Sequence, residues 1–370
     1  MPLSAVQPDH YQALLDAKVA AVCELLAPCE PPPPEVFASP PTGFRMRAEF
    51  RVWHDGDALD YVMFRPRDPK TPVPISRFPI ADPQIQALMP RLLERLRPCP
   101  TLRRKLFQVE FLATLAGEVL VTLIYHRPLE DDWGAAATRL RTELQAHAGS
   151  LSIIGRSRKQ KLVLGDDYVR ETLSVDGTAY HYRQYEQSFT QPNARVNTHM
   201  LEWACARAGE LPPGDLLELY CGNGNFTLPL SRHFGSVIAT EVAKSSTRAS
   251  RFNLDENGID NVHLVRLSAE ETSEAMAGKR EFRRLAELPR PLAQFGLRTL
   301  FVDPPRAGLD EQTVAMAAGF DAILYISCNP QTLAQNLVVL HRTHTVSHLA
   351  LFDQFPYTQH MECGVVLRRR

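Results

Sequence analysis

The chain has 370 residues, of which 44% are hydrophobic and 22% are charged. At about 150 residues per domain, this length predicts two or three globular domains, and the composition excludes disordered and fibrous classes. The 41 basic and 42 acidic side chains leave a net charge of −1. The chain as a whole therefore does not attract nucleic acid, and any such binding must come from local patches and specific contacts.

The cysteines and the apolar runs exclude several other classes. Seven cysteines are an odd number at low density, which disfavours a disulfide scaffold and favours a reducing, cytoplasmic location. The closest pair, Cys23 and Cys29, does not form a CxxC motif, so we expect neither a metal site nor an iron–sulfur cluster. No apolar run reaches the roughly 18 residues that a membrane span needs.

The first third of the chain predicts a helix followed by a strand. Apolar residues recur at helical spacing over residues 10–27, and the prolines at 31–34 form a stiff extended connector. The segment Phe44–Trp53 alternates strictly between apolar and polar residues, which predicts a half-buried strand. Three arginines lie on its outer face, which is either a solvated sheet face or a face that contacts RNA: Arg45, Arg47 and Arg51.

Further mixed elements follow up to about residue 179. Residues 79–97 and 133–148 predict helices, and the runs Lys105–Leu115 and Glu118–His126 predict a hairpin that turns at residues 116–117. Next come the short β-like run Leu151–Ile154 and a basic cluster, which is a solvated loop or a nucleic-acid patch. Residues 1–179 therefore predict an N-terminal helix and an α+β domain.

From about residue 180, short apolar runs alternate with helical stretches. This pattern indicates β-α units and a parallel sheet, in which ligands bind at the carboxyl ends of the strands. Residues 180–370 therefore predict a second, α/β domain. Its predicted strands are Leu216–Tyr220, Val237–Thr240, Val262–Leu267, Thr299–Val302 and Ala322–Ile326.

A glycine turn follows the first of these strands. Gly222 and Gly224 allow the backbone to turn tightly and to approach a ligand, and the helix that follows offers free N–H groups to an anion. Glu241 ends the next strand, where a carboxylate can accept hydrogen bonds from both ribose hydroxyls of an adenosine ligand. NAD and S-adenosylmethionine both fit this pattern. A third glycine is missing from the turn, which leaves a less cramped helix start.

The fourth predicted strand favours S-adenosylmethionine. It ends in Asp303 and two prolines, which fix the chain direction and hold the acid at the carboxyl edge of the sheet. An acidic residue before two prolines resembles the S-adenosylmethionine-dependent methyltransferases. In the enzymes of this class that methylate nitrogen, an aromatic residue normally follows the prolines, whereas here Arg306 follows.

The fifth strand ends in Cys328, either a nucleophile beside the cofactor or a buried structural cysteine. Carbon 5 of uracil is a poor nucleophile until a thiolate adds to carbon 6, and a base must then remove the proton from carbon 5. Cys328 suits the first role and Glu362 the second. The neighbouring Cys363 is interpreted as structural.

Four motifs occur in the order GNGNF, DPPR, SCNP and HMEC, which begin at Gly222, Asp303, Ser327 and His360. In this order they resemble the RNA uracil-C5 methyltransferases. The segments FRMRAEF, SFTQPN and FDQFPY resemble the bacterial tRNA branch of that family. The related ribosomal-RNA enzymes carry an iron–sulfur cluster on closely spaced cysteines, and this chain lacks that spacing.

The resemblance implies a class I, Rossmann-like methyltransferase domain and an N-terminal RNA-binding domain. It implies S-adenosylmethionine as methyl donor, without a metal, and transfer to carbon 5 of the T-loop uridine 54 of tRNA. Cys328 would be the nucleophile and Glu362 the base. The cofactor contacts that it implies are Gln191, Tyr220, Asn225, Glu241 and Asp303.

The target base must leave a folded loop, so the N-terminal domain is expected to hold the T-arm of tRNA through arginines and stacked rings. The candidates are Arg45, Arg47, Arg51, Phe107 and His126. T-arm-like loops of other RNAs are further expected substrates, and no obligate protein partner is expected. Three alternatives stay open: a ribosomal-RNA uracil methyltransferase, a methyltransferase that acts on nitrogen, and a non-catalytic RNA-binding protein.

Overall fold

The structure is a computed structural model, and it describes residues 6–65 and 68–370, without the side chain of residue 69. Its contacts group the chain into two compact units. Unit 1 contains Pro40–Thr172 and Arg183–Ala194, and unit 2 contains Asp9–Ser39, Leu173–Tyr182 and Arg195–Arg370. This division differs from the predicted boundary between residues 179 and 180, because residues 9–39 pack in unit 2.

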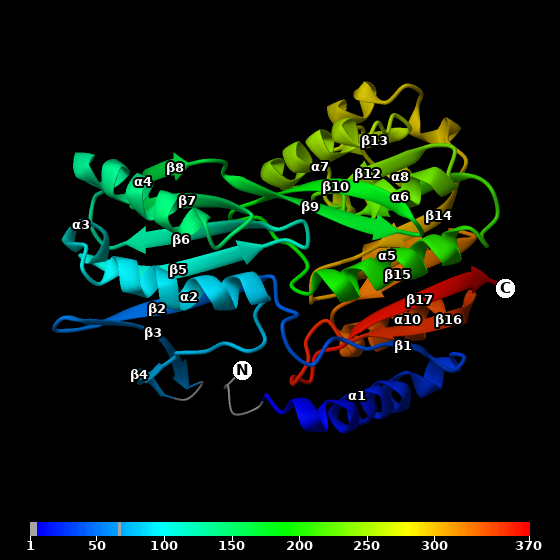
Figure 1. Cartoon of the computed structure of the whole chain (residues 1–370). Helices are drawn as coiled ribbons and strands as arrows, with labels where there is room; N and C mark the ends of the chain where they lie inside the picture. The colour runs from blue at the N-terminus through cyan, green and yellow to red at the C-terminus, as the bar shows by residue number, and fades with distance from the viewer. Residues whose placement is uncertain (1–5, 66–67) are drawn as a thin grey trace. The chain divides into compact units, whose positions relative to one another are not determined.

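Unit 1 is built on a seven-stranded sheet with the order β4-β3-β2-β5-β6-β7-β8. All neighbouring strands are antiparallel except β6 and β7. The bounds are β2 Arg47–Asp55, β3 Ala58–Arg65, β4 Asp68–Pro74, β5 Leu106–Ala113, β6 Glu118–Tyr125, β7 Ser150–Ser157 and β8 Gln160–Leu164, with the helices α2 Pro83–Leu96, α3 Pro100–Arg103 and α4 Asp131–Gln145 (Figure 1).

The alternation predicted for the first strand of unit 1 is confirmed. In β2, Ala48, Phe50 and Val52 are buried, whereas Glu49 and Arg51 are exposed. The ring of Phe50 packs against Tyr61 of β3 and Phe111 of β5 in the core. The strand therefore has one face in the core of unit 1 and an opposite, open face that carries charge.

Two further strands, β9 Tyr168–Val175 and β10 Thr178–Tyr185, form a separate two-stranded sheet. The chain crosses from one unit to the other within each of them, after residues 172 and 182. The sequence analysis predicted neither strand.

Unit 2 is built on an eight-stranded sheet with the order β1-β16-β17-β15-β14-β11-β12-β13 (Figure 1). All five strands predicted after residue 180 are present as β11–β15, and they are parallel because a helical or looped crossover joins each to the next. The strands are β1 Glu35–Phe37, β11 Asp215–Leu219, β12 Val237–Thr240, β13 Val262–Val265, β14 Leu297–Val302, β15 Ala322–Ser327, β16 His344–Phe352 and β17 Glu362–Arg369.

The helices of unit 2 are α1 Tyr11–Leu26, α5 Ala194–Ala208, α6 Thr227–Leu230, α7 Lys244–Glu256, α8 Ala269–Met276, α9 Glu311–Ala317 and α10 Pro330–Leu340. The N-terminal helix α1, blue in Figure 1, contacts α10 near the end of the chain. Strand β1 pairs in parallel with β16. Residues 9–39 therefore belong to unit 2, and their strand β1 extends its sheet.

Candidate active site

The order of strands in unit 2 places one reversal of the chain beside β11. From β11 the chain moves outward to β12 and β13, and then returns to β14 and β15 on the other side of β11. In parallel sheets, ligands bind beyond the carboxyl ends of the strands at such a reversal. The predicted residues Tyr220, Asp303 and Cys328 follow β11, β14 and β15 directly, so the structure brings them to this one edge.

The turn after β11 has an unusual backbone. Tyr220, Gly222 and Gly224 all have positive φ angles, of 60°, 58° and 88°. A Cβ atom on Gly224 would lie 2.8 Å from Leu228 Cδ1 and 3.0 Å from Ser250 Oγ, so only glycine fits there. The helix after the turn, α6, has only four residues. A helix of one turn has little macrodipole, so any anion contact here would depend on the free N–H groups themselves, and the expected anion site stays a prediction.

Glu241 is tied to this turn. Its Oε2 accepts a hydrogen bond of 3.1 Å from the backbone N–H of Gly222, and its Oε1 accepts one of 2.7 Å from the N–H of Ala243. Each carboxylate oxygen can accept a further hydrogen bond. Glu241 is half-buried at the end of β12, so an oriented carboxylate stands beside the glycine turn, as the ribose role requires.

Asn225 has a partner that the sequence did not reveal. Its side-chain amide exchanges two hydrogen bonds of 2.9 Å with the amide of Asn197, a buried residue of α5. Its backbone carbonyl accepts a bond of 3.1 Å from the hydroxyl of Tyr182. The amide of Asn225 is thus fixed in one orientation and keeps one N–H and one lone pair for a ligand.

A buried carboxyl group, Glu218, lies on β11 just before the turn and was also missed. The side chain is 1% exposed, and burial raises its pKa to about 8. A side-chain hydrogen bond with Thr227 partly offsets this rise in the pKa. The sequence signal that could have revealed Glu218 is an acidic residue inside the apolar run DLLEL.

Cys328 and Glu362 are brought together by the antiparallel pairing of β15 with β17. Ile326 pairs with Gly364 and Ser327 with Cys363. The next position along each strand is Cys328 on one side and Glu362 on the other. Glu362 is 4% exposed and Cys328 is half-buried. Residues that are far apart in the sequence therefore meet at the carboxyl edge, as a nucleophile and base pair would.

Burial raises the pKa of each acidic group of this site, and repulsion from neighbouring acids adds to the rise for Glu362 and Cys328. Burial raises the pKa of Asp303 to about 7. Burial and the charge of Asp303 raise the pKa of Glu362 well above its ordinary value. The pKa of Cys328 rises to about 11, first through burial and then through Glu362 and Asp303, while Arg306 lowers it. A cation bound here would favour the ionised form of all three groups.

Arg306 lies close enough to Cys328 to influence its pKa. The sequence analysis used it only as a departure from the pattern of the enzymes that methylate nitrogen. Its Nη2 lies 3.2 Å from His360 Nδ1, and its carbonyl accepts a bond of 2.9 Å from Asn329 Nδ2. Burial and the charges of Arg306 and Lys18 lower the pKa of His360. The segment DPPR and the segment HMEC therefore meet in the folded chain.

Three of the five candidate RNA contacts form one stack on the open face of unit 1. The guanidinium of Arg51 lies 3.6 Å from the ring centroid of Phe107, and that ring stacks on His126 with centroids 3.7 Å apart. Arg51 and His126 are exposed and Phe107 is half-buried. Aromatic and guanidinium planes of this kind are what unpaired bases stack on.

The two remaining arginines contact the backbone of unit 1. Arg45 Nε donates to the carbonyl of Arg47 at 2.8 Å. Arg47 Nη2 donates to the carbonyls of Glu186 and Ser188 at 3.1 and 3.0 Å. Burial lowers the pKa of both guanidinium groups. Arg47 thus braces the segment that leads to Gln191, a half-buried loop residue of unit 1 whose contact with a cofactor stays a prediction.

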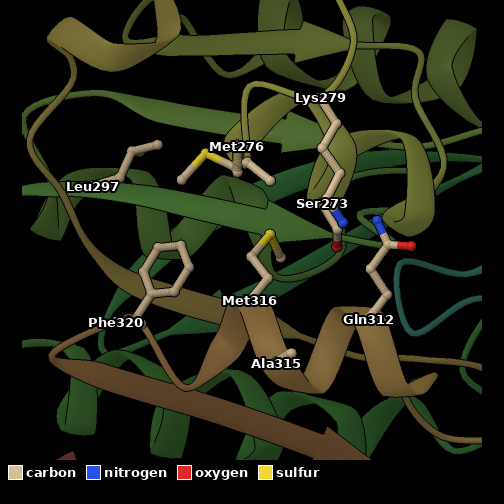
Figure 2. A pocket seen from close by; sticks show the side chains of 10 residues that line it. Ser273, Met276, Lys279, Leu297, Gln312, Ala315, Met316 and Phe320 are labelled. Carbon is tan, nitrogen blue, oxygen red and sulfur yellow. The ribbon is translucent and has the colours of Figure 1, made fainter.

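A cavity of about 400 Å³ in unit 2 lies at the other edge of the sheet. Leu297 begins β14 and Phe320 precedes β15, so the cavity is at the amino ends of these strands. Figure 2 shows the side chains of Met276 and Met316 in the middle of the cavity, with Leu297 and Phe320 on one side and Lys279 and Gln312 on the other. None of the described residues that line it is a predicted site residue.

The described part of the chain contains no group of three or more His, Cys, Asp or Glu side chains placed to hold a metal ion. All seven cysteines lie within it and are free thiols. Within residues 6–65 and 68–370, no helix is long and apolar enough to cross a membrane.

Comparison with known proteins decides the family. The model of the tRNA (uracil-5-)-methyltransferase family matches residues 10–370. The chain belongs to this family. It is 54% identical to the tRNA/tmRNA (uracil-C(5))-methyltransferase of Aromatoleum aromaticum over all of this chain and 98% of that one. The corresponding protein of Vibrio parahaemolyticus is 51% identical over 99% of this chain and 98% of its own length.

The fold has a relative among solved structures. The tRNA (uracil-54, C5)-methyltransferase of Pyrococcus abyssi, solved in complex with S-adenosyl-L-homocysteine, superposes with a TM-score of 0.71. The two chains are 21% identical, and the match covers 98% of this chain and 85% of that one. The predicted family, methyltransferase class and Rossmann-like fold are thus confirmed. The alternative of a ribosomal-RNA enzyme is not favoured.

Proposed function

We propose that this enzyme transfers a methyl group from S-adenosylmethionine to carbon 5 of the T-loop uridine 54 of tRNA. Family membership supports the tRNA uracil reaction. The pairing of β15 with β17 supports the covalent route, because it sets Cys328 beside a buried acid at the ligand edge of the sheet. That juxtaposition is the observation on which the proposal rests.

The residues around the glycine turn fit the cofactor. Gly224 has no room for a side chain, and Glu241 is oriented beside Gly222. We assign Tyr220, Asn225 and Glu241 to its nucleoside side and Asp303 to its cationic side, while Gln191 keeps the role that the resemblance implies. S-adenosylmethionine, when bound, supplies an electrophilic methyl group next to the acids of the site.

The residues of the chain perform the remaining chemistry. The thiolate of Cys328 adds to carbon 6 of the uracil, and the electron pair of the ring double bond moves toward carbon 5, which becomes nucleophilic. After methylation, the carboxylate of Glu362 takes the proton from carbon 5. The electron pair of that C–H bond restores the double bond, and the bond between Sγ and carbon 6 breaks. Arg306 favours the ionised form of Cys328 during these steps.

Unit 1 is proposed to hold the T-arm while the uridine is flipped out of its loop. The stack of Arg51, Phe107 and His126 offers flat surfaces to unpaired bases. Phe189 is a further candidate, because it is 76% exposed, which is unusual for a large apolar residue. The sequence analysis did not name it. The curated relatives are named for tRNA and tmRNA, and we propose that a T-arm-like loop of the second RNA is accepted as well.

Replacing Phe107 with alanine is expected to raise the KM for tRNA by about 10-fold, since base stacking on an aromatic ring contributes about 1–3 kcal/mol. The kcat at saturating tRNA and the affinity for S-adenosylmethionine should stay at the wild-type values. Steady-state kinetics and calorimetry measure these quantities. Leu162→Ala, at an exposed position of β8 in the same sheet, is the matched control. An unchanged KM in Phe107→Ala would remove the stack from the RNA surface.

The proposed function is tested by methyl transfer from labelled S-adenosylmethionine to an unmodified tRNA transcript, followed by nucleoside analysis. The expected product is 5-methyluridine, and the label should be lost when uridine 54 is replaced. Label in a methylated amino group of another nucleoside would instead show a methyltransferase that acts on nitrogen. Label in ribosomal RNA but not in tRNA would retain the Cys328 chemistry and refute the substrate.

A further inference from the structure

The loop 353–361 joins β16 to β17 and leads directly to the proposed base. Phe352, the last residue of β16, pairs with Glu362, the first residue of β17, so the two ends of the loop meet at this pair. Within the loop, Tyr357 has a φ of 63°, a left-handed conformation that a residue other than glycine keeps only when its surroundings hold it. The placement of Glu362 at a strand end therefore depends on what holds this loop.

The N-terminal helix α1 contacts the loop at three of its residues. The hydroxyl of Tyr11 donates to Asp353 Oδ2 at 3.0 Å, and Lys18 Nζ donates to Asp353 Oδ1 at 2.5 Å. Lys18 Nζ also donates to the carbonyl of Phe355 at 3.2 Å. The ring of Tyr11 meets the edge of the Tyr357 ring, with centroids 6.0 Å apart.

These contacts are buried and charged. The side chain of Asp353 is 1% exposed and that of Lys18 is 11% exposed. A buried carboxylate without its cationic partner strongly destabilises the fold. The loop therefore has one favoured position against the helix, in which Asp353 keeps its partner Lys18. The hydroxyl of Tyr11 in turn accepts a bond of 2.7 Å from the N–H of Ser39, which fixes the ring.

The same helix also packs behind the nucleophile. Leu15, Val22 and Leu26 of α1 are buried in the core of unit 2, and α1 contacts α10. Helix α10 begins at Pro330, two positions after Cys328. Helix α1 therefore rests against both the helix that follows the nucleophile and the loop that precedes the base, although it lies outside the β-α units that carry them.

We propose that α1 is a brace for the active site and that Tyr11 and Lys18 are positioning residues for the step in which Glu362 removes the proton. This inference rests on the proposed function. Neither residue touches the reacting atoms. Both act through Asp353 and the loop, so their loss should slow the breakdown of the covalent complex with RNA more than its formation.

The test uses the full chain with Tyr11→Phe, which removes one hydroxyl, and with Lys18→Met, with Lys18→Arg as the conservative variant. Gln12→Ala is the matched control, because Gln12 forms an exposed hydrogen bond with Asp16 on the same helix. Hydrogen exchange at residues 353–361 is expected to become about 10-fold faster in Tyr11→Phe and Lys18→Met. Methyl transfer should fall by up to about 10²-fold, and covalent enzyme–RNA complex should accumulate on gels.

Lys18→Arg should recover part of the rate, and Gln12→Ala should match the wild type in all three measurements. Unchanged exchange at residues 353–361 would overturn the brace, and so would a slower rate without added covalent complex. If the wild type forms no denaturation-resistant adduct with RNA that contains 5-fluorouridine, the covalent mechanism itself fails. That result is distinct, because the exchange rates test the brace without RNA.

Discussion

Replacing Cys328 with alanine is expected to abolish methyl transfer, with a loss of about 10⁴-fold or more. Without a thiolate at carbon 6, carbon 5 of the uracil stays a poor nucleophile. The residue is half-buried at the end of β15, so the loss of its Sγ should leave the fold intact. The measurements are methyl transfer to tRNA, thermal unfolding, and calorimetric binding of S-adenosylmethionine, of which only the first should change.

Cys363→Ala is the matched control for this experiment. Cys363 is fully buried on β17, pairs with Ser327 and has a raised pKa because of that burial. We expect this variant to retain the denaturation-resistant adduct with 5-fluorouridine RNA, which Cys328→Ala should lose. If Cys328→Ala retains methyl transfer, Cys328 is not the nucleophile. The same conclusion follows if Cys363→Ala loses the adduct while its thermal stability is unchanged.

The sequence predicted the part of this site that local patterns control. Tyr220, Asp303 and Cys328 each follow a short apolar run, and such runs become parallel strands when helical stretches separate them. The carboxyl ends of parallel strands meet at one edge, so Asp303 and Cys328 were predicted to converge without knowledge of the pairing, whereas Tyr220 was named through the family resemblance. The alternation in β2 was equally local and gave the correct buried face.

Elements that depend on distant pairing were not predicted. The segment that contains Glu362 reads alone as a late loop with surface charges, whereas in the structure Glu362 is buried at the start of β17. That strand lies between β15 and β16 and is antiparallel to both. The parallel pairing of β1 with β16 depends in the same way on residues near opposite ends of the chain.

The hydrogen-bond partners of polar side chains also could not be predicted from local sequence patterns. The outward direction of Arg47 follows from the alternation of β2, but its guanidinium bends to the carbonyls of Glu186 and Ser188. The pairing of Asn225 with Asn197 joins the glycine turn to α5. A residue type shows which hydrogen bonds a side chain can form, and only the fold decides which group is within reach.

Replacing Glu362 with glutamine is expected to lower kcat by about 10²- to 10⁴-fold and to make covalent enzyme–RNA complex accumulate, because an amide cannot take the proton from carbon 5. Cys328 should still add to the ring and methyl transfer should still occur, so the reaction should stop at the later step in which the proton leaves carbon 5. Gel analysis of denatured mixtures with ordinary tRNA measures the complex, and label from S-adenosylmethionine should be present in it.

The pH dependence of stability gives an independent view of this acid. Burial and Asp303 raise the pKa of Glu362 well above its ordinary value of 4.5. The folded state therefore holds a proton that the unfolded state releases, so this contribution is complete below the unfolded pKa and is lost as the pH rises toward the folded pKa. Glutamine needs no proton. The Tm of Glu362→Gln relative to wild type should thus increase from pH of about 5 to about 8.

The matched control is Asp321→Asn, which removes a half-buried carboxylate that pairs with Arg298 at the amino end of β15, away from Cys328. It should change neither the amount of covalent complex nor the slope of Tm against pH. A Glu362→Gln variant with no more complex than wild type would show that another group removes the proton. A slope equal to that of the wild type would show that Glu362 is ionised in the folded protein, and the raised pKa would then be refuted separately from the base assignment.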